Sequence, residues 1–474
     1  MNIASQITAE DIVLLSETHF TELITKLLYA ETSNFSELVL NLSIPSKENT
    51  ADGGEDGRLE LDDNFPVNQF IKFHKNFYQI KAYDVAPAKC ASEVVCTINN
   101  NIKEIKPTIK QAITDGYFYI WYMKKSLSPK MRKDRINATK KAFNDHGILD
   151  ANVGIIDADD LKNWVNHFPS LIAYVKFCNN QSLIGVNWLE QCPEYKIKYH
   201  SSKAMDKLKD DVLKYVKVPN STDAIRIIGN SGIGKTHFII NVLSQDKYIE
   251  NLCLYINCSD HSDISNIIDL VSNYKNSTCI LILDNCSLHN HQRIQRLKAE
   301  SASFKLISID SNLEDDSYQE YRIINIISDN QVEAVKKILD TVIVGDHREM
   351  YLNSLAAYCD GYPLLANKVS LAIQKHGLDG LDIATLIDTS SVNKWLFEKI
   401  PELSIDNLKK VITGLSFFSY ISFTDNGIIF RESEKEAADE QFAFLTKYFF
   451  DNMTQKEFKK ICKTLIKMTF LGAC

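Results

Sequence analysis

The sequence lacks the features that mark a secreted or membrane-spanning protein. Its first fifteen residues do not combine a basic start with an apolar stretch, as a signal peptide would. No apolar run approaches the roughly 20 residues that cross a bilayer. The 11 cysteines include no C-x-x-C pair, and Cys253 with Cys258 is too isolated to indicate a zinc site. We therefore expect reduced, mostly buried thiols in a cytoplasmic protein that does not contact a membrane.

A net positive charge is also missing, because 53 basic residues face 61 acidic ones and the formal net charge is −8. A dedicated nucleic-acid binder is usually basic, so any contact with DNA must come from a local patch. Hydrophobic residues make up 45% of the 474 positions and charged residues 24%, which is ordinary globular composition. A chain of this length is expected to form roughly two to four domains. No repeat of about 20–50 residues is present.

Residues 1–177 are expected to form a mixed α/β domain. A helix is predicted over residues 10–30, where an apolar stripe recurs at helical spacing: Phe20, Leu23, Ile24, Leu27 and Leu28. Strands and further helices alternate after it, which indicates a mixed sheet covered by helices. The predicted strands are 58–61, 77–83, 117–123 and 154–157, and the predicted helices are 91–112 and 130–145. Residues 178–202 show no clear period and are expected to be a linker.

A second α/β domain is predicted over residues 203–328. Its strands are apolar runs that alternate with helical segments, a pattern typical of a parallel sheet: 225–228, 252–256, 279–283 and 306–309. From residue 329 onward the patterns are helical, and we divide them into a domain at 329–394 and a further region at 395–474. The sequence stops in the apolar segment Phe470 to Cys474, so we expect it to be part of a longer protein.

A phosphate-binding loop follows the first strand of this second domain. The segment fits G-x-x-x-x-G-K-S/T and lies between a predicted strand and a helix that His237 helps to open: Gly229, Asn230, Ser231, Gly232, Ile233, Gly234, Lys235 and Thr236. The glycines allow the backbone N–H groups to face phosphates at a helix N-terminus. Lys235 is expected to reach the β and γ phosphates, and the Thr236 hydroxyl to ligate Mg²⁺. The predicted cofactors are ATP and Mg²⁺.

The second motif expected in a P-loop protein is also present: the apolar strand that starts at Cys279 ends in a carboxylate, Asp284. This carboxylate is expected to hold Mg²⁺ together with Thr236. Residue 285 is Asn, where active ATPases often carry a second acid that activates water. We therefore expect slow hydrolysis and a nucleotide-gated switch in preference to a motor.

A third motif brings a family into view. The segment Cys359 to Ala366, CDGYPLLA, resembles the G-x-P motif that follows the nucleotide domain in STAND NTPases. The resemblance covers roughly residues 200–474 and implies that Pro363 lies against the nucleotide base and that residues 395–474 begin a winged-helix region. The family often has an arginine sensor after the strand at 306–309, and Ser308-Ile309-Asp310 offers none.

The N-terminal domain carries a pattern typical of metal-dependent nucleases. Asp56 follows a glycine-bearing stretch, and Gln79 and Lys81 stand two apart on the next predicted strand, so both point to one face. Asp56 and Gln79 are candidate Mg²⁺ ligands, and Lys81 would orient or activate water. The arrangement resembles the PD-(D/E)xK superfamily in its Mrr-like variant, which implies a restriction-endonuclease-like fold. In that superfamily an acidic residue on the first helix also joins the site, and Glu22 matches its placement. The alternative interpretation of the whole pattern is an ordinary glycine turn beside a strand with polar residues.

A basic stretch follows the third predicted strand. Eight basic residues are opposed only by Asp134: Lys124, Lys125, Lys130, Arg132, Lys133, Arg135, Lys140 and Lys141. Such a run is compatible with a helix that tracks a DNA backbone and equally with a solvated helix face.

A Mrr-like domain joined to a STAND NTPase resembles the Avs antiviral proteins of bacteria. That resemblance implies an ATP-gated anti-phage effector whose missing C-terminal sensor binds a phage protein, of the terminase or portal type. Sensing would assemble the chains into a homo-oligomer, expected to be a tetramer, which cuts double-stranded DNA. One alternative is a nucleotide-gated signalling scaffold whose N-terminal domain is an inactive interaction module. A restriction-type motor nuclease is less favoured, because helicase motifs are absent after Asp284.

Overall fold

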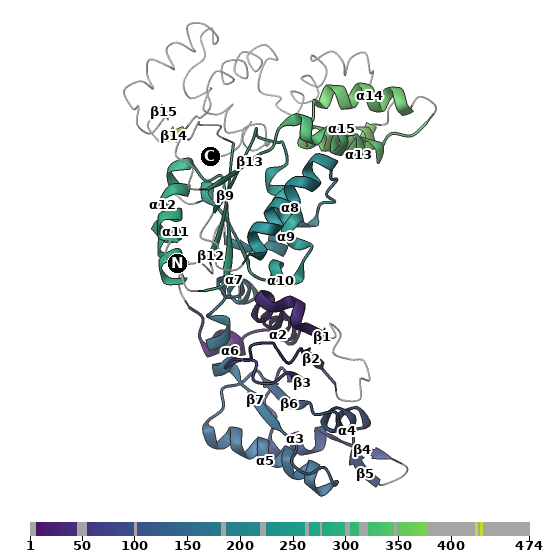
Figure 1. Ribbon diagram of the computed structural model, residues 1–474, viewed down its shortest axis with the longest axis vertical. Helices are drawn as coiled ribbons and strands as arrows, with labels where there is room; N and C mark the ends of the chain where they lie inside the picture. The colour runs from purple at the N-terminus through teal and green to yellow at the C-terminus, as the bar shows by residue number, and fades with distance from the viewer. Residues whose placement is uncertain are drawn as a thin grey trace.

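The computed structural model shows two α/β bodies stacked end to end, with three helices extending from the second body (Figure 1). The mixed α/β character and the parallel strands predicted from the sequence are confirmed. The residues that the structure describes are 6–44, 55–98, 102–181, 186–218, 224–260, 265–274, 277–298, 304–311, 321–345, 348–376, 422–424 and 427–429.

The N-terminal body is built on a five-stranded sheet in the order β1-β2-β3-β6-β7. The first three strands pair antiparallel, whereas β3, β6 and β7 pair in parallel. Three of these strands follow the predicted runs closely, and β3 begins and ends about two residues before its prediction. The bounds are β1 Val39–Ser43, β2 Gly57–Leu61, β3 Lys75–Lys81, β6 Phe118–Met123 and β7 Val153–Ile156.

Helices cover both faces of this sheet, and each face has its own apolar core. Side chains alternate along β3, so Tyr78 and Ile80 face one core while Phe77 faces the other. On the first face, towards the second body, lie α1 Ala9–Val13, α2 Glu17–Glu31, α6 Ala158–Val165 and α7 Pro169–Cys178. On the second face lie α3 Pro87–Glu93, α4 Pro107–Thr114 and α5 Pro129–Asp145.

Two helix predictions in this body need correction. The helix expected over residues 10–30 is interrupted at Leu14–Ser16, where Ser16 caps the new helix α2 through its side chain. The helix expected over 91–112 is wrong, because a β-hairpin of β4 Val95–Ile98 and β5 Ile102–Ile105 divides it into α3 and α4. Pro107 begins α4, where a missing backbone N–H is harmless.

The second body contains a six-stranded sheet in the order β13-β9-β12-β11-β10-β8. All neighbours pair in parallel except β8, which runs antiparallel to β10 at the edge. The four predicted strands are confirmed, and β13 was missed. The bounds are β9 Ala224–Ile228, β10 Cys253–Asn257, β11 Cys279–Asp284, β12 Phe304–Asp310 and β13 Arg322–Asn325. One strand, β12, therefore separates the strand before the phosphate loop from the strand that ends in Asp284.

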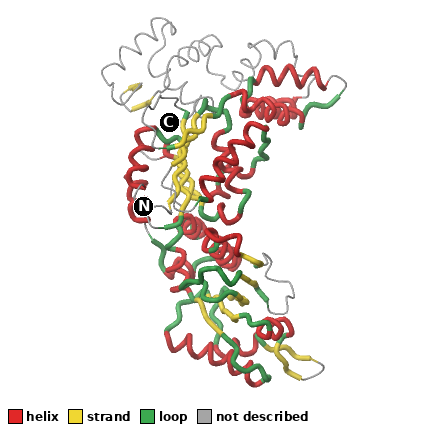
Figure 2. The backbone as a smooth tube through the Cα atoms, viewed as in Figure 1, coloured by secondary structure: helices red, strands yellow, loops and turns green. Residues whose placement is uncertain are grey.

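Helices flank this sheet on both sides, as Figure 2 shows with the sheet seen on edge. Every residue of β11 is buried, because helices cover both faces of the sheet. This explains why the strand appears in the sequence as a nearly continuous apolar run. One side carries α8 Lys203–Lys217, α9 Lys235–Ser244 and α10 Lys247–Glu250, and the other carries α11 Ser265–Tyr274 and α12 Leu288–Lys298.

The segment expected to be a featureless linker, 178–202, is part of the second sheet. Its strand β8, Val186–Trp188, adds to β10, and two short 3₁₀ turns follow at Leu189–Gln191 and Pro193–Lys196. The edge position explains why periodicity missed β8, since a three-residue strand is too short to show a pattern. This connector ties the two bodies together directly.

The described part of the region from residue 329 to 376 is helical, as expected, with α13 Val332–Asp340, α14 Arg348–Cys359 and α15 Pro363–His376. The winged-helix prediction for 395–474 lies outside the described residues, apart from a hairpin of β14 Ser422–Thr424 and β15 Gly427–Ile429. Among the helices that the structure describes, none is both long and apolar enough to cross a membrane.

Candidate nucleotide site and N-terminal polar cluster

The loop at residues 229–236 curls at the carboxyl end of β9 and leads into α9. Gly229, Gly232 and Gly234 all have positive φ, at 149°, 80° and 94°. At Gly229 a Cβ atom would stand 2.3 Å from the backbone oxygen of Ile326, so no other residue fits there. The predicted loop therefore has a backbone conformation that depends on its glycines, with the N-terminus of α9 directed at its hollow.

Lys235 is held inside the loop. Its side-chain ammonium donates to the carbonyl oxygens of Gly229 at 2.7 Å and Asn230 at 3.0 Å. Burial lowers the pKa of Lys235 from its ordinary value of 10.5, while the carboxylates of Asp284 and Asp310 act in the opposite direction. A buried cation in a surrounding of low dielectric attracts an anion strongly, which suits a phosphate-binding lysine.

Thr236 and Asp284 meet beside the loop, as their predicted joint role in binding Mg²⁺ requires. The Thr236 hydroxyl donates to Oδ2 of Asp284 at 2.8 Å. The same oxygen accepts a second hydrogen bond from the hydroxyl of Tyr255 at 2.7 Å. Tyr255 was missed by sequence reasoning, because it is one residue of an apolar strand and carries no motif. Its hydroxyl helps to hold the buried carboxylate in place beside Thr236.

Asn285 follows Asp284 in a left-handed conformation with φ of 52°. Its side-chain amide donates to Oδ1 of Asn257 at 2.9 Å, so the amide is directed towards the end of the neighbouring strand β10. An amide cannot act as a general base for water. Slow hydrolysis stays an expectation from the sequence.

The segment with the G-x-P motif covers the phosphate loop. Tyr362 accepts a hydrogen bond from Asn230 at 2.7 Å, and the backbone N–H of Leu364 donates to the oxygen of Gly232 at 3.3 Å. Pro363 lies close to Gly234, where a Cβ atom would be 3.7 Å from its Cγ. The structure therefore brings Pro363 to the loop. We call residues 360–364 the lid segment.

Two further contacts place the 328–331 turn against both the lid segment and the phosphate loop. Gly361 has φ of 74°, and a Cβ there would lie 2.2 Å from the backbone oxygen of Ser328. Gln331 donates from its side-chain amide to the oxygen of Ile233 at 3.0 Å. Neither Gln331 nor Ser328 carried a sequence signal, because their roles arise from the packing of the 328–331 turn against the loop.

The remaining nucleotide-site candidates sit around this core. His237 faces the connector, with Nε2 placed 3.0 Å from the oxygen of Ile197. The end of β12 has no arginine of its own, but Arg226 of β9 reaches it and pairs with Asp310 at 2.6 Å. The Arg226 guanidinium is almost wholly buried and also donates to the Cys286 oxygen at 2.9 Å. Sequence reasoning missed this cation, since it belongs to the neighbouring strand.

The N-terminal candidates Asp56 and Gln79 lie in direct contact. Oδ2 of Asp56 accepts hydrogen bonds from the side-chain amide of Gln79 and from the backbone N–H of Ile80, the latter at 2.7 Å. The hydroxyl of Tyr119 donates to Oε1 of Gln79 at 3.3 Å. Gln79 therefore presents its nitrogen to Asp56, and its amide must turn over before its oxygen can join Asp56 as a metal ligand.

Lys81 lies on the same face of β3 and pairs with Glu93 of α3 at 3.7 Å. Glu93 also pairs with Lys89 at 3.0 Å. Burial by itself raises the pKa of Glu93, but its hydrogen bond with Lys89 and the charges of both lysines outweigh burial and leave that pKa below its ordinary value. Glu93 is a carboxylate that sequence reasoning missed, because it was placed inside a long predicted helix.

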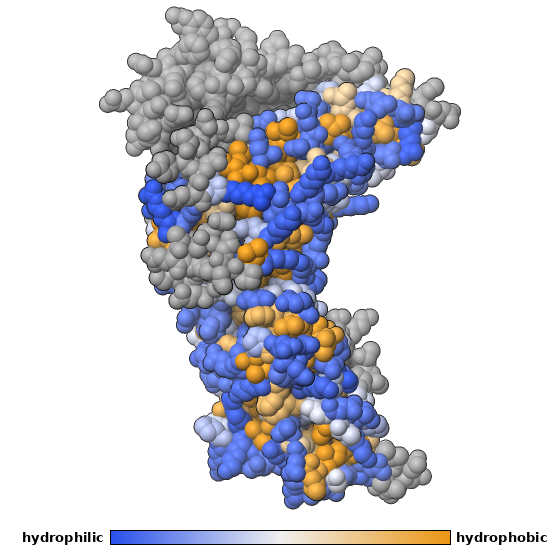
Figure 3. Space-filling model, in the orientation of Figure 1, coloured by the Kyte–Doolittle hydropathy of each residue, from blue (hydrophilic) through white to orange (hydrophobic). Residues whose placement is uncertain are grey.

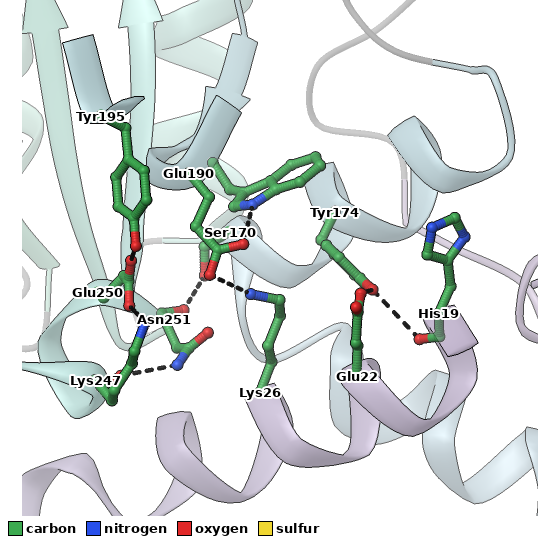
Figure 4. A network of polar contacts seen from close by, with 11 residues as sticks. His19, Glu22, Lys26, Ser170, Tyr174, Glu190, Tyr195, Lys247, Glu250 and Asn251 are labelled. Carbon is green, nitrogen blue, oxygen red and sulfur yellow. Dashed lines mark hydrogen bonds and ion pairs between the residues drawn. The ribbon is translucent and has the colours of Figure 1, made fainter. Parts of the chain in front are cut away.

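Glu22 does not join this cluster, which corrects its expected placement. Its Oε2 accepts a hydrogen bond from the Tyr174 hydroxyl at 2.7 Å, and α2 packs on the opposite face of the sheet from Gln79. Figure 4 shows Glu22 among the residues that connect the two bodies. Among the described residues, no three His, Cys, Asp or Glu side chains are gathered as a metal site.

The contact between the two bodies combines an apolar cluster that runs through both with polar pairs, some of them buried (Figure 4). Lys26 of α2 pairs with Glu190 of the connector at 3.0 Å. The hydroxyl of Ser170 donates to the backbone oxygen of Asn251 at 2.7 Å, and both residues are buried. The connector then continues to the 3₁₀ turn at Pro193–Lys196, which packs against the phosphate-loop helix α9. One continuous segment thus contacts both α2 and the nucleotide site.

The basic stretch divides into structural and exposed residues. Four of its members are engaged within the fold. Arg135 is buried against Asp84 and the Val85 oxygen, and Arg132 pairs with Asp157 and Asp160. Lys124 donates to the backbone oxygen of Leu15, and Lys125 pairs with Asp84. The others lie exposed on α5: Lys130, Lys133, Lys140 and Lys141. Figure 3 shows a hydrophilic surface where α5 lies. Only this exposed half remains a candidate for contact with DNA.

Comparisons with known proteins add weak similarities. No protein-family profile and no curated protein match the sequence. Among solved structures, DNA-bound ORC1 of Aeropyrum pernix is 12% identical with a TM-score of 0.33, covering 60% of this chain and 87% of that one. AMPPCP-bound DnaA from Aquifex aeolicus is 13% identical with a TM-score of 0.32, covering 60% and 94%. Scores this low do not establish a shared fold, so the function is inferred from the geometry of the sites.

Proposed function

We propose that the second body is a nucleotide switch that binds ATP with Mg²⁺. The observation that carries this proposal is the contact of Thr236 with Asp284 beside a loop that buries Lys235. A hydroxyl and a carboxylate are oxygen ligands of the kind that Mg²⁺ prefers, and they lie next to a cation and a helix N-terminus that attract phosphates. The bound metal would neutralise charge on the phosphates. The residues that would hold the nucleotide are 229–237, Asp284 and Pro363.

The lid segment supports a switch in preference to a motor. Its contacts with Asn230 and Gly232 link the three C-terminal helices to the loop that would hold the phosphates. A ligand shifts such an equilibrium only if it binds one arrangement of lid and loop better than another. The amide of Asn285 cannot act as a general base, so ATP would be hydrolysed slowly and the ATP-bound state would last longer.

For the N-terminal body we propose a Mg²⁺-dependent endonuclease that cuts double-stranded DNA. The contact between Asp56 and Gln79, with Lys81 on the same face of β3, supports this proposal. Asp56 would hold the metal with the Gln79 oxygen, and Glu93 is a further oxygen donor beside Lys81. The bound metal would polarise the phosphate, and Lys81 would orient the attacking water. The exposed lysines of α5 would contact the DNA backbone.

The biological role that we propose is antiviral defence. It is supported by the resemblance of the motifs to Avs-type STAND proteins with a Mrr-like nuclease. In this proposal a phage protein of the terminase or portal type triggers the switch. The chains then form a homo-oligomer, a tetramer by that resemblance, and the clustered nuclease domains cut DNA.

The alternative is a nucleotide-gated scaffold whose N-terminal body is a catalytically inactive interaction module. Three observations favour it. Glu22 is engaged by Tyr174 away from Asp56, and among the described residues no group of three acidic, histidine or cysteine side chains forms a metal site. Gln79 also turns its amide nitrogen towards Asp56.

The nucleotide proposal is tested by titrating the full chain with a fluorescent ATP analogue in the presence and absence of Mg²⁺. We expect saturable binding that Lys235→Ala weakens by at least tenfold, since the ammonium contributes a buried charge interaction. Lys209→Ala is the matched control, because Lys209 lies half-buried on α8 and its ammonium donates to Gln245, outside the phosphate loop. Equal binding by the Lys235 and Lys209 variants would refute the proposal.

The nuclease proposal is tested separately, by incubating the full chain with supercoiled plasmid, Mg²⁺ and ATP. Cleavage that Asp56→Asn abolishes supports the endonuclease, and its further loss in Lys235→Ala supports gating by the nucleotide. Nucleotide binding without any cleavage by wild-type protein, at concentrations where it oligomerises, favours the scaffold.

A further inference from the structure

A cavity of about 790 Å³ opens beside the edge strand β7 in the N-terminal body. Its floor is the sheet surface formed by Phe118 and Ile120 of β6 and by Gly154 of β7. Helix α6 and the segment 69–73 form its walls. The volume falls within the range of about 300–1,000 Å³ that small-molecule sites occupy.

This cavity is separate from both sites described above. Ile120 belongs to the core on the α2 and α6 side of the sheet, whereas Tyr119, which contacts Gln79, belongs to the core on the α3 side. Adjacent residues of a strand point to opposite faces. The cavity therefore lies on the other face of the sheet from Asp56, Gln79 and Lys81, and it belongs to a different body from the phosphate loop.

Aromatic rings line the cavity in parallel pairs. Phe73 stacks on Phe118, with ring centres 3.8 Å apart and planes 11° from parallel, and Phe73 is 37% exposed. Phe70 stacks on Trp164 at 5.3 Å with planes 5° apart. A Cβ at Gly154 would stand 2.8 Å from the Phe118 ring, so glycine lets that ring lie flat against the strand. Exposed ring faces of this kind accept another flat ring.

Polar groups surround these rings and are available to a ligand. Gln69, Lys72 and Asn163 line the cavity and are exposed, and their side chains make no hydrogen bond or ion pair in the described part of the chain. The two amides each offer a donor and an acceptor, and Lys72 adds a positive charge. Arg132 and Asp160 also line the cavity, paired with each other at 2.7 Å.

This combination decides the class of ligand. The charged and amide groups disfavour a lipid, and the unpaired charge of Lys72 disfavours a free metal cation, since Arg132 is matched by Asp157 and Asp160. A flat heterocycle that has hydrogen-bonding edges and carries an anionic group matches the aromatic rings, the two amides and the charge of Lys72. We propose that this cavity binds a nucleotide, with the base against Phe73, its edge towards Gln69 and Asn163, and its phosphate near Lys72.

Such a nucleotide has two possible sources, and both share this chemistry. It is either a free mononucleotide or a base turned out of a DNA duplex, which enzymes that act on bases also accommodate in pockets. Arg132 lies on α5, the helix whose exposed lysines are the candidate DNA contact. DNA bound along α5 would therefore pass close to the cavity, as an extruded base requires.

The test uses the full chain with Lys235→Ala, which is expected to weaken binding at the phosphate loop at least tenfold. The four deoxynucleoside monophosphates are titrated by calorimetry, and a duplex with 2-aminopurine opposite a mismatch is followed by fluorescence, which rises when the base leaves the stack. Phe73→Ala is expected to weaken binding roughly tenfold, as loss of a stacking partner does. Asn163→Ala should weaken it less, and Lys103→Ala, an exposed charge outside the cavity, should leave it unchanged.

Mononucleotide binding that Phe73→Ala weakens, without a fluorescence rise, assigns the free nucleotide. A fluorescence rise that Phe73→Ala removes assigns the extruded base. The proposal is overturned if neither probe binds, or if Phe73→Ala and Asn163→Ala bind as tightly as Lys103→Ala. Phe73→Tyr keeps the ring and guards against a folding defect, because it should restore binding.

Discussion

The hydroxyl of Thr236 and the carboxylate of Asp284 lie 2.8 Å apart, joining the first turn of α9 to the carboxyl end of β11. Strand β12 lies between β9 and β11, so this contact reaches from the loop after β9 across one intervening strand to the end of β11. Carboxyl ends of parallel strands converge at one edge of a sheet, where α/β proteins bind their ligands. The pair marks the place where a metal would meet the phosphates.

Asp284→Asn is expected to remove the Mg²⁺-dependent part of ATP affinity while leaving metal-free binding nearly unchanged. An amide keeps the shape of the side chain and its acceptor oxygen but loses the charge that attracts the cation. Titration of a fluorescent ATP analogue with and without Mg²⁺ measures both parts. Tyr255→Phe is the companion variant, because it removes one donor to Asp284 and keeps the charge. An undiminished response of Asp284→Asn to Mg²⁺ would place the metal elsewhere.

Gly361→Ala is expected to release the lid segment, whereas Gly345→Ala is not. Both glycines have positive φ, 74° and 110°, so both substitutions carry backbone strain of about 1 kcal/mol or more. Only at Gly361 would the new Cβ meet a backbone atom, the Ser328 oxygen at 2.2 Å; at Gly345 nothing lies within 4 Å. Dissociation of the ATP analogue should be faster in Gly361→Ala alone. Identical dissociation rates in the two variants would contradict the lid assignment.

The ion pair of Lys26 with Glu190 should make the contact between the bodies sensitive to acid. Burial by itself raises the pKa of Glu190, but the charge and hydrogen bond of Lys26 outweigh it, so the pKa lies below the ordinary 4.5. The stabilisation is therefore complete above pH 4.5 and is lost as pH falls through the lowered pKa. Its size is expected to be about 1 kcal/mol.

A double-mutant cycle of Lys26→Gln and Glu190→Gln, measured by denaturant unfolding across this pH range, isolates the pair. The coupling should be present at neutral pH and vanish in acid. A coupling that grows as the pH falls has the wrong sign for this pair and would exclude it as a link between the bodies.

Lys81 and Lys89 provide a matched comparison within the N-terminal cluster. Both pair with Glu93, but only Lys81 lies on β3 beside Gln79. If the cluster cuts DNA, Lys81→Ala should lower the rate of plasmid cleavage at least a hundredfold, because it removes the group that orients water. Lys89→Ala should retain activity within a few-fold. Equal rates for Lys81→Ala and wild type would remove the nuclease from the proposed function.

The two halves of the basic stretch should respond differently to substitution. Lys133→Ala with Lys140→Ala is expected to weaken binding to duplex DNA and to reduce its salt dependence, since two phosphate contacts are lost. Arg135→Ala should instead destabilise the fold by about 1–3 kcal/mol, because it leaves the buried Val85 oxygen without its donor, whereas the exposed Asp84 keeps Lys125. Binding to DNA is measured by fluorescence anisotropy at several salt concentrations. A salt dependence unchanged by the lysine substitutions would exclude α5 as the DNA contact.

The sequence by itself determined the features whose signal is local. The phosphate loop is a run of eight adjacent positions, 229–236, whose glycines and lysine act where they stand. The buried strands of the second sheet are continuous apolar runs, and the stripe on α2 has helical spacing, so period and composition located them. The spacing of Gln79 and Lys81 likewise put both side chains on one face of β3.

Only the tertiary structure decided which distant residues meet. It brought Tyr255 to Asp284, Arg226 to Asp310 and Tyr362 to Asn230, and it placed Glu22 on Tyr174 away from Asp56. These contacts depend on strand order and on the face to which each helix packs. Neither is encoded in the periodicity of a single segment, because both follow from how all the apolar faces are buried together.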